Sequence, residues 1–357
     1  MGRLGIVLAL LLALLLPCPA AGAADGSDDT VVTFPDANLD AAVREAIGKP
    51  AGDIHRSDLA GLTTLTLVGM DIANLTGLEH CTGLTELNLR FNELSDIAPL
   101  GSLTGLTKLD LRFNRISDLT ALGELTNLTE LDLGRNDLSD ITPLGNCTAL
   151  TELSLWWNQV SDIAPLGKLT SLIDLDLAVN QVSDITPLGA LTGLTGLSLS
   201  GNRISDLTSL AASTGLITLT LSGNEINDLA PLAGLTNLTQ LYLGFNEISD
   251  VTPLASLTNL ESLFLGNNTI SDISPLLENS GLGNGDYVNL ISNPLSTDSI
   301  TIYIPALEAR GVICSPYTPH EKKDGSIYLR VGIIAAVVLA VWVSVGVVVS
   351  RRRARTG

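Results

Sequence analysis

Acidic side chains that recur at a fixed interval are the first residues of this 357-residue chain that could do chemistry. Nine aspartates follow one another at intervals of 22 residues: Asp96, Asp118, Asp140, Asp162, Asp184, Asp206, Asp228, Asp250 and Asp272. A stacked row of carboxylates could bind calcium, but no glycine-rich calcium loop accompanies these residues. We therefore expect each carboxylate to cap free backbone N–H groups at the start of a short helical turn.

Residues that support catalysis or metal binding do not share a position in this period. His55, His80 and His320 fall at unrelated phases, and no GxSxG, Walker or HExxH motif occurs. We therefore expect no enzyme activity, no metal and no cofactor. The 38 acidic and 19 basic residues give a formal net charge of −19, which disfavours nucleic acid as a partner because phosphate needs a basic face.

Aromatic and arginine side chains also recur in phase, just ahead of a repeated asparagine. All seven aromatic residues between Cys81 and Asn268 lie four, two or one positions before such an asparagine, where they would point away from the core. With three arginines in the same positions they form the candidate ligand-binding surface: Arg90, Phe91, Arg112, Phe113, Arg135, Trp156, Trp157, Tyr242, Phe245 and Phe264. Exposed rings on one face are typical of binding hot spots. The alternative is that the charges pair across strands and the rings only cover the sheet.

The candidate surface is not uniform along the chain. Positions 196–223 present only glycine, serine and threonine in the phases that face outward. The binding hypothesis therefore centres on two patches, 90–157 and 242–264.

The element that positions these side chains is a 22-residue repeat. Nine asparagines mark consecutive copies: Asn92, Asn114, Asn136, Asn158, Asn180, Asn202, Asn224, Asn246 and Asn268. Each copy carries the pattern LxxLxLxxNxI, which is typical of leucine-rich repeats. In one copy Leu109 and Leu111 alternate with polar residues, so they point inward from a short strand, and stacked copies share one core. We expect the asparagine amides to bond backbone groups of adjacent turns as a ladder.

Two cysteines replace a core leucine in the same phase of the repeat. Cys81 and Cys147 lie three repeats apart, about 14 Å if neighbouring strands stack at about 4.8 Å. A disulfide needs Cα atoms within about 7 Å. We therefore expect both to be buried free thiols.

Less regular segments close the two ends of the repeat array. Residues 34–54 read as an amphipathic helix with Leu39, Val43 and Ile47 on one face, and Met70 then stands where an asparagine belongs. At the other end Asn293 follows 25 residues after the previous asparagine. Beyond it the sequence predicts a helix over 296–310 and a short closing strand over 311–314.

The two ends of the chain carry targeting and membrane signals. Residues 1–23 read as a cleaved secretory signal peptide, and 331–350 form an uncharged apolar stretch followed by arginines. We expect a single-pass protein of the cell membrane with its amino-terminal domain outside. The predicted organisation is a signal peptide at 1–23, an N-terminal cap and atypical repeat at 24–80, nine repeats at 81–277, a C-terminal cap at 278–314, a linker at 315–329, a transmembrane helix at 330–350 and a basic cytoplasmic tail at 351–357.

The unit LTxLxxLxLxxNxISDIxPL and the NPLS sequence at 293–296 resemble the internalin-like leucine-rich repeat surface proteins over about 70–320. The resemblance implies an α/β solenoid: a horseshoe with a parallel sheet on its concave face, 3₁₀ turns on its convex face, a helical N-terminal cap and a C-terminal cap of helix and strand. It also implies a binding role without catalysis. Two departures from the family are the lack of an LPxTG sorting motif before the apolar stretch and of an Ig-like domain after the repeats.

The function expected from the sequence is binding of an extracellular protein or glycan on the concave face, with adhesion as one form of it. Two other interpretations stay open. One is a structural envelope spacer without a defined ligand, and the other is the ligand-binding subunit of a sensor complex.

Overall fold

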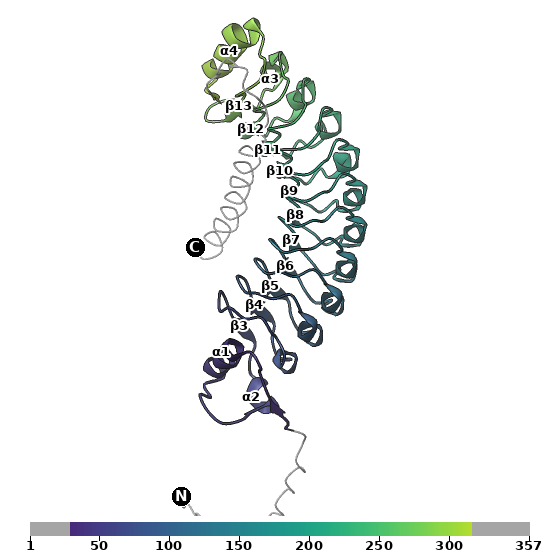
Figure 1. Ribbon diagram of the computed structural model, residues 1–357. Helices are drawn as coiled ribbons and strands as arrows, with labels where there is room; N and C mark the ends of the chain where they lie inside the picture. Colours follow the sequence, from purple (N-terminus) through teal and green to yellow (C-terminus); the bar gives the residue numbers. More distant parts are fainter. Residues whose placement is uncertain (1–28, 316–357) are drawn as a thin grey trace, which may run out of the picture.

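The computed structural model describes residues 29–315, which form one curved solenoid (Figure 1). Twelve strands build a single parallel sheet along its concave side, in chain order from β3 to β14. The strands are β3 Thr64–Thr66, β4 Glu86–Asn88, β5 Lys108–Asp110, β6 Glu130–Asp132, β7 Glu152–Ser154, β8 Asp174–Asp176, β9 Gly196–Ser198, β10 Thr218–Thr220, β11 Gln240–Tyr242, β12 Ser262–Phe264, β13 Tyr287–Asn289 and β14 Ile313–Cys314. The parallel sheet predicted from the repeat is therefore confirmed.

The register of the sheet places each repeat directly on the one before it. Leu87, Leu109 and Leu131 are partners on adjacent strands, and each is buried between more exposed neighbours. Because the same register holds throughout, the leucines of all repeats merge into one continuous core. No repeat buries its apolar side chains alone, so stability comes from stacking.

Short turns line the convex side opposite the sheet (Figure 1). Nine are 3₁₀ turns: Leu78–His80, Ala98–Ser102, Thr120–Glu124, Thr142–Asn146, Ala164–Lys168, Thr186–Ala190, Thr208–Ala212, Ala230–Leu232 and Thr252–Ser256; the tenth is the α-helix α3, Ser274–Glu278. Each recurring aspartate caps its turn: Oδ1 of Asp96 accepts the N–H of Ala98 at 2.8 Å, and Asp272 does the same for Ser274. The capping role predicted for this column is confirmed.

The N-terminal cap is shorter in helix than the sequence pattern suggests. Helix α1 spans Ala37–Ile47, so the predicted helix over 34–54 is too long at both ends. Gly48 ends it at a φ of 66°, and its N–H donates to Glu45 O at 3.2 Å. The chain then forms β2, which pairs antiparallel with β1, and helix α2. Their bounds are β1 Val31–Val32, β2 Ile54–His55 and α2 Arg56–Leu59.

Asp36 joins this cap to the first repeat. One carboxylate oxygen caps α1 through the N–H groups of Asn38 and Leu39, and the other accepts the N–H of Ala73 at 2.9 Å. A single side chain therefore fixes the helix against the start of the solenoid.

The C-terminal cap contains the helix and strand expected after Asn293. A π-helical turn, Ser299–Tyr303, continues into helix α4, Ile304–Ala309, and β14 closes the sheet. The predicted signal peptide and transmembrane helix lie outside the described residues. Within 29–315 no helix is both long and apolar enough to cross a membrane.

The cysteines of the repeats are free, as predicted. Cys81 and Cys147 are fully buried, and the Cys147 thiol donates to Leu122 O at 3.3 Å. Burial raises the pKa of Cys81 to about 12 and that of Cys147 to about 11. Both side chains act as small core residues.

Candidate functional site on the concave face

Asparagine side chains fix the turn that follows each strand. Nδ2 of Asn114 donates to Leu89 O at 3.0 Å and to Leu111 O at 2.9 Å, while its Oδ1 accepts the N–H of Leu94 at 3.1 Å. The same pattern runs from Asn92 through to Asn293 in the C-terminal cap. The ladder holds the residues just before each asparagine in one repeated backbone conformation.

The residue immediately before each asparagine has a left-handed backbone. The φ angle is 58° at Phe91, 57° at Phe113 and 55° at Trp157, whereas two other repeats place Gly201 and Gly223 there. An L-residue in this conformation costs about 1–2 kcal/mol, and glycine does not bear that cost. Bulky side chains are therefore held at these positions against the local backbone preference, a feature that the sequence reasoning missed.

Four rings and one guanidinium form a contiguous group, called the ring cluster below: Phe91, Phe113, Arg135, Trp156 and Trp157. Phe91 and Phe113 stack at 4.2 Å, and Trp156 meets Phe113 edge-on at 5.6 Å and Trp157 at 6.5 Å. The Arg135 guanidinium lies 4.5 Å from the Trp157 centroid and 5.4 Å from that of Phe113. Phe91 remains 48% exposed and Trp157 39% exposed, so the cluster faces solvent.

The remaining predicted arginines lie beside the ring cluster. The Arg90 guanidinium is 6.0 Å from the Phe91 centroid, and its Nε is buried without a hydrogen-bond partner among residues 29–315. Arg112 instead contacts the last residues of β5 and β6, Asp110 at 2.8 Å and Asp132 at 3.2 Å. Arg112 therefore pairs across strands, as the alternative interpretation of the surface expected, while Arg135 packs between rings.

Carboxylates cluster next to the arginines on the concave face, at the first and third residues of strands β4 to β8. We call this group the acidic edge: Glu86, Asp110, Glu130, Asp132, Glu152, Asp174 and Asp176. Lys108 is the one base in the same positions, and its Nζ pairs with Glu130 at 2.7 Å. Asp110, Glu130 and Asp132 of the acidic edge are thus each paired with a cation.

Two carboxylates of the acidic edge are set apart by burial. Burial raises the pKa of Asp176 to about 6, against the hydrogen bonds from the Ala178 N–H and from Ser198. Burial likewise raises the pKa of Asp132, although Arg112 opposes that shift. The charged form of Asp176 is therefore costly to hold on this surface.

Strands β9 and β10 separate the two predicted patches. Their outward positions carry only Gly, Ser and Thr, and Thr220 Oγ1 donates to Ser198 Oγ at 3.0 Å. The two predicted patches are therefore separated by two strands whose outward positions carry neither rings nor charges.

The second patch contains one ring more than the sequence reasoning found. Tyr242 and Phe264 stack at 4.5 Å, and Tyr287 lies 5.2 Å from Phe264. Phe245 holds the left-handed position of its repeat, at a φ of 58°. Tyr287 was missed because the last repeat has 25 residues; counting back six positions from Asn293 would have placed it in phase.

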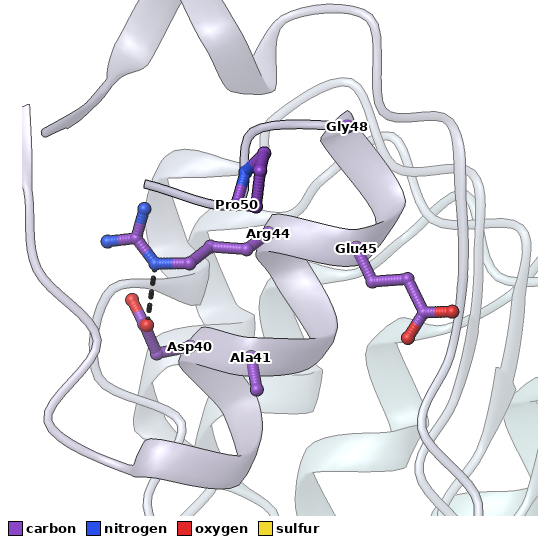
Figure 2. Close-up of a pocket in the computed structure, with 6 residues that line it drawn as sticks. All are labelled: Asp40, Ala41, Arg44, Glu45, Gly48 and Pro50. Atoms are coloured by element: carbon purple, nitrogen blue, oxygen red, sulfur yellow. Dashed lines mark hydrogen bonds and ion pairs between the residues drawn. The ribbon is translucent and has the colours of Figure 1, made fainter. Parts of the chain in front are cut away.

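A surface pocket lies away from these patches, on helix α1 (Figure 2). It is lined by Asp40, Ala41, Arg44, Glu45, Gly48 and Pro50. Arg44 Nε pairs with Asp40 at 2.7 Å, and its Nη1 donates to Gly52 O at 2.9 Å. Asp40 and Arg44 thus neutralise each other within this pocket. Residues 29–315 also contain no group of three or more His, Cys, Asp or Glu side chains placed to hold a metal ion.

Comparison with known proteins places the fold and its repeats in a family. The family described as Leucine Rich repeats (2 copies) matches in overlapping pairs of repeats over 82–278, more than half of the chain. The crystal structure of an internalin (inlF) from Listeria monocytogenes is 35% identical, covers 81% of this chain and 91% of its own, and gives a TM-score of 0.69. The chain belongs to the internalin-like leucine-rich repeat proteins.

Other relatives of this internalin-like protein extend the comparison. An internalin C2 (inlC2) from the same species is 34% identical, covers 66% of this chain and 94% of its own, with a TM-score of 0.52. A plant peptide hormone receptor, RGFR1, in complex with RGF2 is 27% identical over 61% of this chain and 37% of its own, with a TM-score of 0.54. No curated protein sequence matches the chain.

Proposed function

We propose that this internalin-like protein binds a protein ligand on the ring cluster of its concave face. The observation that carries the proposal is backbone strain at exposed rings. Phe91 and Trp157 hold a left-handed backbone while 48% and 39% exposed, at a position where Gly201 meets the same backbone demand without strain. Strained backbone conformations cluster at functional sites, where the surrounding structure holds them in place.

The composition of the cluster supports a protein as the ligand. Tryptophan and arginine dominate the energetics of protein interfaces, and here Trp156, Trp157 and Arg135 touch one another in one group. The plant receptor among the similar structures is in complex with a peptide hormone. A contiguous set of rings with one guanidinium packed against them is the kind of surface that such a ligand needs.

The proposed place of action is the cell surface. The amino-terminal stretch at 1–23 supports export, and the apolar stretch at 331–350 with the arginines after it supports a single membrane anchor. In this arrangement the solenoid is outside the cell, and the concave face meets proteins of a neighbouring surface or of the medium.

The test compares two double variants in affinity capture. Phe91→Gly with Trp157→Gly removes two rings and relieves the backbone, so we expect lost capture with an unchanged or higher melting temperature. Val179→Gly with Asn267→Gly makes the same backbone change outside the ring cluster and should capture the same proteins as the wild type. If the variant Phe91→Gly with Trp157→Gly captures every protein that the wild type captures, the proposal is wrong.

A further inference from the structure

Arg90 and Arg112 occupy the same position in adjacent repeats, two residues before the ladder asparagine. Arg112 binds Asp110 of its own repeat side-on: Nε donates to both carboxylate oxygens at 3.1 Å, and Nη2 donates to Oδ2 at 2.8 Å. A contact of 3.2 Å to Asp132 completes its pairing. Arg90 forms no ion pair with any carboxylate of residues 29–315, and its Nε is buried without a hydrogen-bond partner there.

One residue accounts for the difference between the two arginines. Asn88 stands at the end of β4 where its partner on β5 is Asp110. Asn88 Oδ1 accepts the backbone N–H of Arg90 at 3.2 Å, and Asp110 makes the same bond in the next repeat. The turn is therefore alike in both repeats, and Arg90 lacks only the carboxylate charge. The nearest acid on the following strand, Asp110, is already bound by Arg112.

The unpaired guanidinium lies beside the ring cluster. Its central carbon is 6.0 Å from the centroid of Phe91, a ring that is 48% exposed. A buried N–H of a charged group without an acceptor costs free energy, and a carboxylate acceptor would offset that cost. Because no hydrogen bond holds the side chain of Arg90, it can turn toward a ligand without breaking one.

Arg135 is a second cation without a carboxylate partner among the described residues. It is exposed, and its guanidinium packs against Phe113 and Trp157. A ring face attracts the positive charge without accepting a conventional hydrogen bond, so the N–H donors of Arg135 stay available. The ring cluster thus carries two guanidinium groups that can still accept an anionic partner.

We propose that the partner is a protein segment that places a carboxylate on Arg90, with apolar side chains on the ring cluster and a second acceptor at Arg135. The inference rests on the proposed function, because it names the chemistry of the ligand for the same site. The expected geometry is the side-on pair that Arg112 makes with Asp110, two N–H donors on one carboxylate. Carboxylates outnumber cations over β4 to β8 and repel a strongly acidic ligand, so we expect one carboxylate in a largely apolar segment.

The first test uses random 12-residue peptides, displayed with a free carboxyl terminus and panned on the full chain and on the ring variant Phe91→Gly with Trp157→Gly. Each peptide that needs the rings should carry a carboxylate whose removal weakens binding at least about tenfold. The removal is made with the Asn or Gln analogue and with the C-terminal amide, and the analogue that loses affinity identifies the side chain or the terminus as the source. On Arg90→Gln the same removal should have little effect, because the carboxylate has already lost its partner.

The second test supplies the missing carboxylate from within the chain. Asn88→Asp gives Arg90 the partner that Arg112 has, so the internal pair should compete with the ligand and weaken ring-dependent peptides about tenfold. Asn289→Asp is the matched control. Asn289 ends β13 and accepts the N–H of Ile291 at 3.2 Å, so the same charge enters the same turn with no arginine beside it. This variant should bind the peptides as tightly as the wild type.

The outcomes separate this inference from the proposed function. Ring-dependent peptides that need no carboxylate, or that bind Arg90→Gln or Asn88→Asp as tightly as the wild type, would overturn the inference and leave ligand binding at the rings standing. Equal losses in Asn88→Asp and Asn289→Asp would show that only overall charge matters, which also overturns it. Recovery of no ring-dependent peptide would overturn both proposals.

Discussion

The indole of Trp156 lies directly over the backbone of Gly134 in the preceding repeat. A Cβ added at Gly134 would be 2.0 Å from Trp156 Nε1 and 2.4 Å from its Cδ1. No side chain larger than hydrogen fits beneath the ring. The ring cluster therefore depends on a residue that contributes no side chain to it.

Gly134→Ala should move the Trp156 ring and weaken ligand binding while the solenoid stays folded. The ring is the end of a rotatable side chain, so the free energy of unfolding should change by less than about 1 kcal/mol. Near-ultraviolet circular dichroism should change, because Trp156 would lose its edge contacts with Phe113 and Trp157. Gly101→Ala is the control: its Cβ would have 3.5 Å to the nearest atom. An unchanged dichroism spectrum for Gly134→Ala would contradict the expected ring position.

At the left-handed position, replacing glycine should lower the stability, whereas introducing glycine should leave it unchanged or raise it. Gly201→Ala places a Cβ at a φ of 69° without a clash, so we expect a loss of about 1 kcal/mol from strain alone. Val179→Gly relieves about 1–2 kcal/mol of strain and costs about 0.5–1 kcal/mol in chain entropy. It should be neutral or stabilising by up to about 1 kcal/mol. Urea denaturation measures both, and a marked loss in Val179→Gly would refute the strain account.

Removing one rung of the asparagine ladder should destabilise the whole array. Asn158→Ala leaves the N–H of Leu138 without its partner. The carbonyls of Leu133 and Leu155 each lose one of two donors and keep the other, from Asn136 and Asn180. At about 1–3 kcal/mol for one buried unsatisfied group, we expect a loss of about 1–3 kcal/mol. Met70→Ala alters the corresponding position of the first repeat, where the side chain is 38% exposed, and should change stability by less than about 1 kcal/mol. Similar losses in the two variants would argue against the ladder.

Asp176 should give the stability a pH dependence opposite to that of the capping residue Asp118. Its pKa is about 6 in the folded chain against 3.8 in the unfolded chain, so the folded state binds more protons between these values. The free energy of unfolding therefore falls as pH rises through this window. Asp176→Asn removes that loss and should be more stable than the wild type at pH 7.5, by about 1–2 kcal/mol for a half-buried group, and equal to it at pH 4.

The matched control for this pH dependence is Asp118→Asn. Hydrogen bonds from Thr120 hold the pKa of Asp118 below its usual value, so its contribution is present above that value and lost in acid. The wild type should exceed this variant at neutral pH, and the difference should vanish at low pH. A stability difference between wild type and Asp176→Asn that stays constant from pH 4 to pH 7.5 would rule out the raised pKa.

The period of the sequence predicted most of the fold because each repeat solves the same packing problem. The alternation at Leu109 and Leu111 placed the strands, and the aspartates before the convex turns identified their caps. The helix over 34–54 was drawn too long because its apolar spacing outweighed Gly48 and Pro50, which together mark a helix end. The short helix α2 carries no periodic signal of its own.

The sequence predicted which residues form the candidate site, but it did not predict how they are arranged. The period identified which rings point outward, but the left-handed backbone at Phe91 and Trp157 follows from the ladder and the strand register together. The partners of the arginines depend on rotamers: Arg112 turns to Asp110, and Arg135 turns to Trp157. The spacing of residues in the sequence does not indicate which of these two orientations an arginine side chain adopts.

The left-handed position lies outside the leucine core, so its occupant can change without repacking any neighbour. Phe91, Arg135, Val179 and Gly201 all occupy it above the same buried framework. A lineage of such proteins can therefore acquire a new recognition surface through single substitutions, one turn of the solenoid after another. The backbone strain of each substitution stays at its own left-handed position and does not extend to the leucine core.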